Sequence, residues 1–387
     1  MEICFANDDD KIAVKELWRY CFDDDDDYSQ YFFDKRYKKQ NNLIYKDDDG
    51  EVATSLMLNQ YALKVGGGFE TQTSYIVGVS SVPHKRGLGH MSKLIRYALR
   101  HEKSLGRVYS VLMAIDSRIY DRYGFANACY MYETTMPLAR IDAKPQSGVK
   151  ITKCDYKNTD ELDELVYYYE QKMRGSYLYF KRDREYFLLR EKELELEGFS
   201  VYLAREKGKI TGYMIFTPEF PGKKEAVVKE IFADSKSVYD AFFAMIKSHY
   251  TRTDTVVIHE VGENFIKKYL VFDNKASYKF SPFMMVRILD VREALRHSQI
   301  KADMDISVKD DIIDENNGIF SLTDYRKKSV PAKADLELEI SELTSLILGQ
   351  LTLDDIFKLK NMEVPDKKFE NIRNLFAKKV NWFNDYV

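Results

Sequence analysis

One turn of this chain reads Val79-Ser-Ser-Val-Pro-His-Lys-Arg-Gly-Leu-Gly-His-Met91 and joins a strand-like run at 75–79 to a segment with helical periodicity. Gly87 and Gly89 let the backbone approach a ligand without a Cβ in the way. A helix start offers N–H groups without intrahelical partners and the positive end of the dipole, and Arg86 adds charge. The turn therefore predicts a pyrophosphate site, although an ordinary strand-to-helix turn also uses glycines in this way.

The spacing of this turn resembles the acetyl-coenzyme A loop of the GNAT acyltransferases, whose signature is Arg/Gln-x-x-Gly-x-Gly/Ala. Arg86 and Gly89 match the signature, whereas Met91 stands at its last, usually small, position, as a bulky residue also does in relatives of the Eis (enhanced intracellular survival) type. The resemblance implies that the coenzyme contacts the strand and the turn at Val77, Val79, Arg86, Gly87, Leu88, Gly89, His90 and Met91.

Composition limits the other classes of function. A net charge of −3 over 387 residues argues against a chain-wide surface for nucleic acid or membrane. No secretory signal opens the chain, and no apolar run reaches the length of a membrane span. Four cysteines without paired spacing are typical of free thiols in a reducing compartment, so we expect a cytoplasmic protein. We expect no metal site, and we expect His84 and His90 to be solvated or to face phosphate.

The first fifty residues are acidic, with 14 Asp and Glu against 8 Lys and Arg. The runs at 8–10, 23–27 and 47–49 fit solvated loops and helix N-caps. They also fit a negative field near a cleft that attracts polyamine-like or aminoglycoside-like cations. Both interpretations stay open at this point.

Periodicity predicts the elements of the first domain. We expect helices at 10–22 and 88–103, and strands at 42–45, 52–59, 60–65, 72–82 and 107–115. This order of elements is similar to that of the GNAT fold. The resemblance implies that acetyl-coenzyme A wedges between two splayed central strands of the sheet.

A second motif, Ser117-Arg-Ile-Tyr-Asp-Arg-Tyr-Gly-Phe125, follows the last of these strands. It resembles the Tyr-x-x-x-Gly-Phe segment of GNAT enzymes, in which the first Tyr protonates the departing coenzyme A thiolate. By that resemblance Tyr120 is the general acid. A phenol with an ordinary pKa near ~10 is protonated at neutral pH and is able to donate a proton. The alternative is that Tyr120, Tyr123 and Phe125 are aromatic core residues.

The pattern restarts near residue 149. A helix at 160–173, strands at 199–204, 210–216, 226–232 and 255–261, and a helix at 237–250 repeat the first order without a second cofactor turn. Strands at 303–308, 318–323 and 336–340 and helices at 341–350, 353–361 and 366–379 then resemble the sterol-carrier-like end of Eis-type enzymes. We therefore expect an α+β chain of tandem GNAT-like domains, at 1–148 and 149–288, with mixed central sheets flanked by helices, and a sterol-carrier-like α/β domain at 289–387.

The ending Trp382-Phe-Asn-Asp-Tyr-Val387 is apolar and aromatic, which indicates a segment tucked into the protein. Resemblance to Eis-type enzymes implies that the Val387 carboxylate enters the active site as the base. A terminal residue that merely docks on the core is the alternative. Cys129 near Tyr120 reads as an ordinary, partly buried thiol rather than a nucleophile.

Together these features predict an acetyl-CoA-dependent N-acetyltransferase acting on an amine of a small cation or on lysine. The amine would attack the thioester directly, with a backbone N–H at or near Val77 polarising the carbonyl and without a metal. Alternatives are a non-catalytic lipid- or partner-binding protein and an aminoacyl-tRNA-dependent peptidyltransferase. Relatives form hexamers, so we expect a homo-oligomer with a small-molecule amine substrate.

Overall fold

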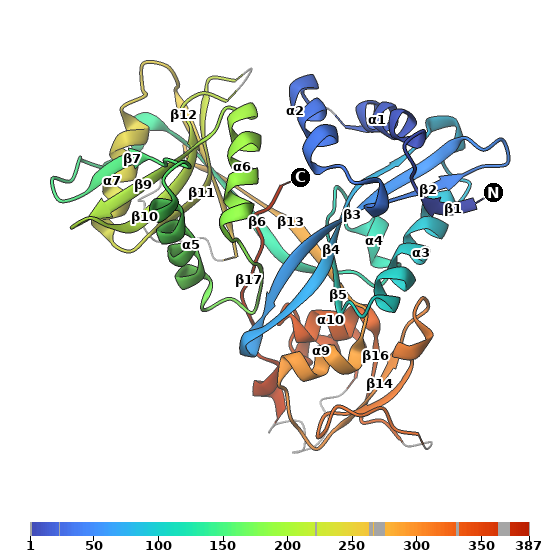
Figure 1. The fold of residues 1–387 in the computed structure, drawn as a ribbon. Coiled ribbons are helices and arrows are strands. Elements are labelled where there is room, and N and C mark those ends of the chain that lie inside the picture. The colour runs from blue at the N-terminus through green and yellow to red at the C-terminus, as the bar shows by residue number, and fades with distance from the viewer. Residues whose placement is uncertain are drawn as a thin grey trace. The chain divides into compact units, whose positions relative to one another are not determined.

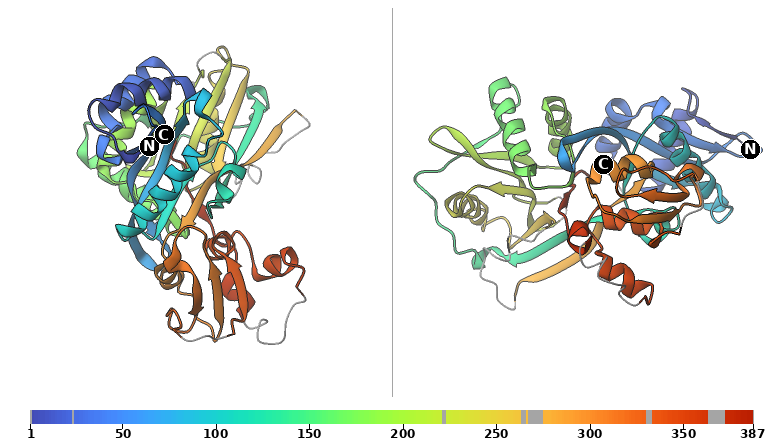
Figure 2. Two further views of the ribbon diagram at one scale, coloured as in Figure 1. Left: turned by 90° about the vertical axis from the view of Figure 1, so that its right-hand side faces the viewer. Right: turned by 90° about the horizontal axis from the view of Figure 1, so that it is seen from below.

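A computed structural model describes residues 2–22, 24–220, 223–262, 266, 275–329, 333–362 and 372–386. The chain forms two compact units. Unit 1 combines residues 1–129, 176–180 and 282–387, and unit 2 combines residues 130–175 and 181–281. Mixed sheets flanked by helices, seen in Figures 1 and 2, confirm the expected α+β class.

The main sheet of unit 1 contains strands from three distant parts of the chain. Its order is β1 (Glu2–Phe5), β2 (Asn42–Lys46), β3 (Val52–Val65), β4 (Phe69–Ser81), β5 (Tyr109–Met113) and β13 (Ser277–Ile288). Neighbours are antiparallel except β4 and β5, which run parallel. The short strand β8 (Leu178–Phe180) pairs with the second half of β3, and β17 (Asn381–Trp382) pairs with β8. The two strands expected at 52–59 and 60–65 are one strand, β3, and the strands β1, β8, β13 and β17 were not predicted.

Four helices accompany the N-terminal part of this sheet, namely α1 (Asp10–Cys21), α2 (Asp26–Tyr31), α3 (His90–Ser104) and α4 (Arg118–Asp121). Helix α3 has an apolar face of Leu94, Ile95, Ala98 and Leu99, which is fully buried against residues of β2, β3 and β5. It begins two residues later than expected, because its N-cap, Gly89, has a left-handed φ of +79°.

The described residues of the C-terminal part of unit 1 add a small sheet and the helices α9 to α11, drawn in orange and red in Figure 2. The sheet order is β15 (Gly318–Ser321), β14 (Asp305–Lys309) and β16 (Leu336–Glu339), and the helices are α9 (Val291–Ser298), α10 (Ile340–Ile347) and α11 (Leu353–Leu359). Residues 366–371 of the helix expected at 366–379 lie outside the described residues. Its described end is wrong as a helix, because Arg373–Phe376 form one 3-10 turn and Ala377 is extended.

Unit 2 repeats the strand and helix order of the first domain. Its sheet runs β6 (Ala126–Pro137), β12 (Thr255–Val261), β11 (Glu225–Ala233), β10 (Lys209–Thr217), β9 (Ser200–Glu206) and β7 (Lys150–Lys153), with helices α5 (Thr159–Met173), α6 (Arg184–Leu196) and α7 (Lys236–Lys247). The pair β11 and β12 is parallel, like β4 and β5. Across the described ranges of both units, no helix combines the length and the apolar character needed to cross a bilayer.

Candidate active site

The turn between β4 and α3 is open at its glycines. Gly87 and Gly89 have φ angles of +82° and +79°, so both need the left-handed conformation that glycine adopts without strain. A Cβ added to either residue would meet nothing within 4 Å. No side chain caps α3, and Lys93 N–H donates to the Gly89 carbonyl at 3.1 Å. The N–H groups at the helix start ahead of Lys93 therefore have no partner within the helix, as an anion site requires.

Two basic side chains border this turn. Lys85 forms an ion pair with Asp47, and this hydrogen bond holds the pKa of the Asp47 carboxyl below its usual range. The exposed Arg86 donates from Nε to the Ser81 carbonyl at 3.1 Å and lies with Nη2 3.6 Å from Cys21 Sγ. Arg86 is thus held along the end of β4, beside the glycines.

The side chains of His90 and Met91 turn away from the open space. His90 is 9% exposed, and its ring stacks on Tyr45 with centroids 4.4 Å apart, so the expectation of a solvated imidazole is wrong for His90. Met91 is half-buried and packs against the core beneath α3, whereas Leu88 is exposed at the tip of the turn. A bulky residue at 91 is therefore compatible with an open turn, because its side chain lies elsewhere.

Strands β4 and β5 separate just before the turn. Their register ends at Ile76 opposite Leu112, although β4 continues to Ser81. On its other side β4 contains a bulge, because Met57 pairs with Val77 whereas Ser55 pairs with Ser80. In this bulge Gly78 has a φ of +62°, and a Cβ there would lie 2.5 Å from Trp18 Cζ3. The β4 edge beyond Ile76, which includes Val77 and Val79, has no ladder partner on the β5 side among the described residues.

Tyr120 lies on the single turn of α4 after β5. Its half-buried ring packs against the core and meets Phe125 edge to face at 6.2 Å. Burial, and secondarily the neighbouring Tyr123, raises the pKa of Tyr120 to about 12. The phenol is therefore protonated across the neutral range, which suits a proton donor.

The C-terminal segment is buried in unit 1, as its aromatic composition predicts. Phe383 and Asp385 are 0% and 2% exposed. Tyr75 lies on β4, two residues before Val77, and its hydroxyl donates to the Asp385 carbonyl at 3.0 Å. The tail therefore lies beside the strand whose edge is open, while Val387 itself is outside the described residues.

Cys129 also contacts this tail, with its Sγ 4.0 Å from the Phe383 carbonyl. Burial raises the pKa of the Cys129 thiol to about 12, so it remains a thiol at neutral pH. This result supports an ordinary buried cysteine rather than a nucleophile.

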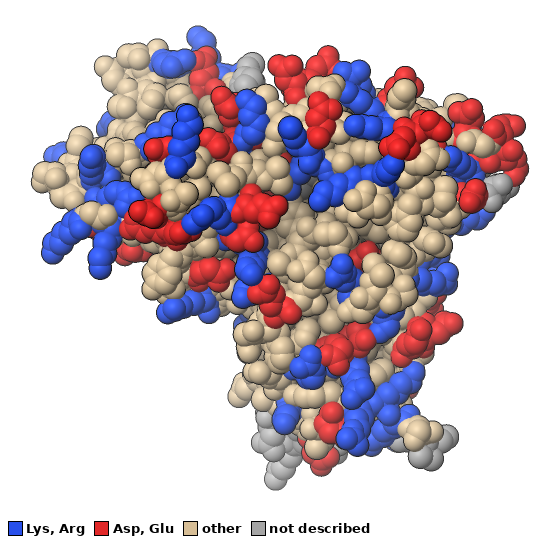
Figure 3. Space-filling view, viewed as in Figure 1, with Lys and Arg blue, Asp and Glu red and all other residues tan. Residues whose placement is uncertain are grey.

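Figure 3 shows Asp and Glu gathered at the top and upper right of this face, over α2 and the turn between β2 and β3. Asp25 accepts a hydrogen bond from Asp27 N–H at the start of α2. Asp47 accepts from the N–H groups of Asp49 and Glu51 in the turn. These contacts favour solvated caps and turns as the main explanation of the acidic runs.

The corresponding helix start in unit 2 is closed. Ser235, the N-cap of α7, accepts a hydrogen bond on Oγ from Val238 N–H at 3.3 Å. Asp234 beside it accepts from the Tyr168 hydroxyl at 3.0 Å. The donors at this helix start are thus partly satisfied by the chain itself, in contrast to α3.

Tyr75 and Gly78 were not predicted as residues of the site. A lone glycine inside a strand pattern is a known signal of a bulge, so Gly78 was accessible from the sequence. Tyr75 was not, because its partner Asp385 lies more than three hundred residues away.

Known proteins resemble this chain over its whole length. Two family models described as "Acetyltransferase (GNAT) domain" match residues 2–128 and 165–288, and a sterol carrier protein domain model matches residues 286–384. An uncharacterized N-acetyltransferase of Streptomyces coelicolor is 24% identical over 315 residues, which are 76% of each chain.

Solved structures share the fold. A GCN5-related N-acetyltransferase of Anabaena variabilis superimposes with a TM-score of 0.80 and 20% identity over all of both chains. A probable N-acyltransferase of Enterococcus faecalis gives 0.82 and 16% identity, covering 100% of this chain and 99% of the other. Eis1 of Mycobacterium abscessus gives 0.75 and 15% identity over both full chains.

Proposed function

Because the chain belongs to the GNAT acyltransferases, with two GNAT domains followed by a sterol carrier protein domain, we propose that it moves an acetyl group from acetyl-coenzyme A to an amine. The observation that carries this proposal is the open turn of Gly87 and Gly89 at the start of α3, next to the stretch of β4 that lies beyond the end of its pairing with β5 at Ile76. The proposed domain bounds remain 1–148, 149–288 and 289–387.

Acetyl-coenzyme A fits the residues around this turn. Backbone N–H groups from Gly87 to Met91 would hold the pyrophosphate, and Arg86 would add a charged contact from its exposed position. The β4 edge at Val77 and Val79 would pair with the amide groups of pantetheine, because its ladder positions toward β5 end at Ile76. A backbone N–H at or near Val77 would also polarise the thioester carbonyl.

The chemistry needs one base and one acid. The amine is protonated at neutral pH and must lose a proton before its nitrogen attacks the carbonyl carbon. We assign this step to the Val387 carboxylate, acting directly or through water. Tyr120, which is protonated at neutral pH, then donates its phenolic proton to the sulfur as the carbon–sulfur bond breaks.

The acceptor proposed is an amine on a polyamine-like or aminoglycoside-like cation, or a lysine. The exposed acidic residues of α2 and the turn near Asp47 favour a cation over an anion in this part of unit 1. Assembly into a homo-oligomer and a cytoplasmic location remain part of the same proposal.

The test is a thiol-release assay with acetyl-coenzyme A and three amines, namely spermine, neomycin and Nα-acetyl-lysine amide. We expect turnover with at least one of them, a large loss of kcat in Tyr120→Phe with little change in coenzyme affinity, and a large loss in a chain extended beyond Val387. Full activity of the extended chain would remove Val387 from the mechanism. Failure of acetyl-coenzyme A to bind in calorimetry would refute the proposal as a whole.

A further inference from the structure

Arg287, near the end of β13, is a fully buried cation that contacts the Tyr120 turn. Its side chain is 0% exposed. Nε donates to the Tyr123 carbonyl at 2.5 Å, and Nη1 donates to the Ile288 carbonyl at 2.8 Å. Nη2 donates to Asp310 Oδ1 at 2.6 Å. All three guanidinium nitrogens are therefore engaged by separate parts of unit 1.

Tyr123, whose carbonyl accepts from Arg287, lies two residues after the short helix that contains Tyr120. Tyr123 N–H donates to the Tyr120 carbonyl at 2.9 Å, and Gly124 N–H donates to the Asp121 carbonyl at 2.9 Å. A helix of one turn does not hold its own shape, so its position depends on contacts that the following residues make with the rest of the unit. Gly124 has a φ of +81°, and a Cβ there would lie 2.6 Å from Ile340 Cγ2 and 3.1 Å from Arg287 Nε. The segment after Tyr120 is thus packed directly against the guanidinium.

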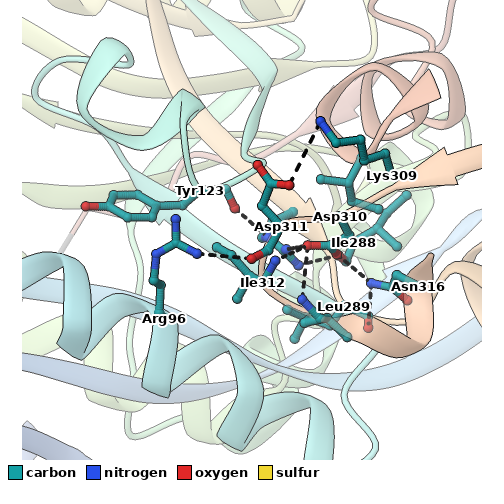
Figure 4. Close-up of polar contacts among 12 residues, drawn as sticks. Arg96, Tyr123, Ile288, Leu289, Lys309, Asp310, Asp311, Ile312 and Asn316 are labelled. Atoms are coloured by element: carbon teal, nitrogen blue, oxygen red, sulfur yellow. Dashed lines mark hydrogen bonds and ion pairs between the residues drawn. The ribbon is translucent and has the colours of Figure 1, made fainter.

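The carboxylate that faces Arg287 is itself immobilised. Asp310 Oδ1 accepts from Ile312 N–H at 2.9 Å and from Ile313 N–H at 3.1 Å. Oδ2 accepts from Asn316 Nδ2 at 2.8 Å, and Figure 4 shows these contacts converging on Asp310. Because these donors fix the Asp310 carboxylate, the carboxylate in turn fixes the position of the Arg287 guanidinium more tightly than the partner in an exposed ion pair would.

The loop around Asp310 also reaches the helix that follows the pyrophosphate turn. Arg96 on α3 donates to the Asp311 carbonyl at 3.1 Å, as Figure 4 shows, and Arg100 donates to the Ile312 carbonyl at 2.9 Å. One loop of the sterol-carrier-like part therefore contacts α3 directly and the Tyr120 turn through Arg287.

We propose that Arg287, fixed by Asp310, is a positioning residue that holds the Tyr120 turn where its phenol meets the coenzyme sulfur. The inference rests on the proposed function, because it needs Tyr120 to act as the acid. Arg287 touches no group of the pyrophosphate turn among the described residues, so its effect should fall on turnover rather than on coenzyme binding. A displacement of about 1 Å at a reacting group lowers rates by about 10²-fold.

The experiment is a double-mutant cycle between Arg287→Lys and Tyr120→Phe, measured as kcat for thiol release with acetyl-coenzyme A and the most active amine of the panel. Lysine keeps the charge toward Asp310 but is unable to span Asp310 and the Tyr123 carbonyl together. We expect Arg287→Lys to lower kcat about 10- to 100-fold with KM for acetyl-coenzyme A within about 3-fold. In the Tyr120→Phe chain the same substitution should change kcat by less than about 2-fold.

The matched control is Arg182→Lys in unit 2. Arg182 is equally buried, at 2% exposure, and is paired with Glu230 at 2.8 Å. Its loss should lower the melting temperature comparably and change kcat by the same factor in both backgrounds. Asp310→Asn, which is nearly isosteric, runs through the same cycle as a second variant of the pair.

The outcomes separate the two proposals. If Arg287→Lys lowers kcat by the same factor in the wild-type and Tyr120→Phe chains, or does not lower it, the positioning role of Arg287 is overturned. The effect of Tyr120→Phe alone still tests the role of Tyr120 as the acid. An unchanged kcat in Tyr120→Phe alone refutes the acid and with it the inference. Unfolding of both Arg287→Lys and Asp310→Asn would make the pair a requirement for folding and would also overturn it.

Discussion

Replacing Gly89 by alanine tests the open turn most directly. In the free protein the only cost is conformational, since a Cβ at Gly89 meets nothing within 4 Å while its φ is +79°. An alanine in the left-handed region costs about 1–2 kcal/mol. For a chain of 387 residues, each kcal/mol of this cost lowers the melting temperature by about 1 °C, because the unfolding entropy grows with chain length.

Coenzyme binding adds a second cost at this position. The new methyl group would stand where the pyrophosphate approaches the N–H groups, so at least one charge-assisted hydrogen bond is lost. Such a bond contributes about 1.5–3 kcal/mol, so the Kd for acetyl-coenzyme A should rise about 10- to 100-fold in titration calorimetry.

Gly208→Ala provides the matched control. Gly208 lies in the hairpin between β9 and β10 with a φ of +82°, and a Cβ there also meets nothing within 4 Å. Both variants should lose similar stability, yet only Gly89→Ala should lose affinity. Equal Kd values in the two variants would refute the assignment of the turn to the pyrophosphate.

Three further substitutions report on other parts of unit 1. Arg86→Ala should raise the Kd for acetyl-coenzyme A about 10-fold. The increase should be smaller at high salt, because Arg86 is exposed and its interaction with phosphate is screened. Unchanged affinity in calorimetry would contradict the contact between Arg86 and phosphate. Tyr75→Phe removes the hydrogen bond to the Asp385 carbonyl, so the free energy of unfolding in urea should fall by about 1–3 kcal/mol. The same variant should have a lower kcat and an unchanged affinity for the coenzyme. Full turnover in this variant would show that the tail contact has no part in catalysis. Burial lowers the pKa of Lys379 from 10.5 to about 8. Between about pH 8 and pH 10.5 this lysine is therefore protonated in the unfolded chain but neutral in the folded chain. The free energy of unfolding of the wild-type protein should accordingly rise with pH across this range. Lys379→Met should therefore be more stable by about 2 kcal/mol at pH 7, with the gain fading toward pH 10.5 in melting curves; an equal gain at both pH values would contradict the pKa.

Local sequence pattern predicted the turn and the elements beside it. Gly87 and Gly89 were identifiable because glycine is the residue that adopts a positive φ without strain, and both residues have the left-handed φ. Strands β2 to β4 and helix α3 followed from periodicity, with ends displaced by a few residues, because helix and strand ends depend on capping rather than on period. The roles of Tyr120 and Val387 stay predictions.

Long-range pairing explains what the pattern missed. Strand β8 has only three residues, too few to show alternation, and it exists because it pairs with β3 more than one hundred residues earlier. In β13 the charged Arg287 interrupts an apolar run, which would suggest that this side chain is exposed. It is buried instead, because its charge is paired with the buried carboxylate of Asp310. The buried tail was predicted from its aromatic residues, but its contact with Tyr75 was not, since no local feature names a distant partner.

The contribution of β13 and β17 to the first sheet affects how the protein is made. During translation the nascent chain completes β1 to β5 early, but the strand beside β5, β13, is complete only when residue 288 has been added, and β17 only when residue 382 has been added. A ribosome that stops before residue 310 would release a chain with the pyrophosphate turn but without Asp310 and the tail, and a later stop would still remove the tail. Truncated products should therefore be inactive and exposed to proteolysis, which links catalytic competence to synthesis of the C-terminal segment.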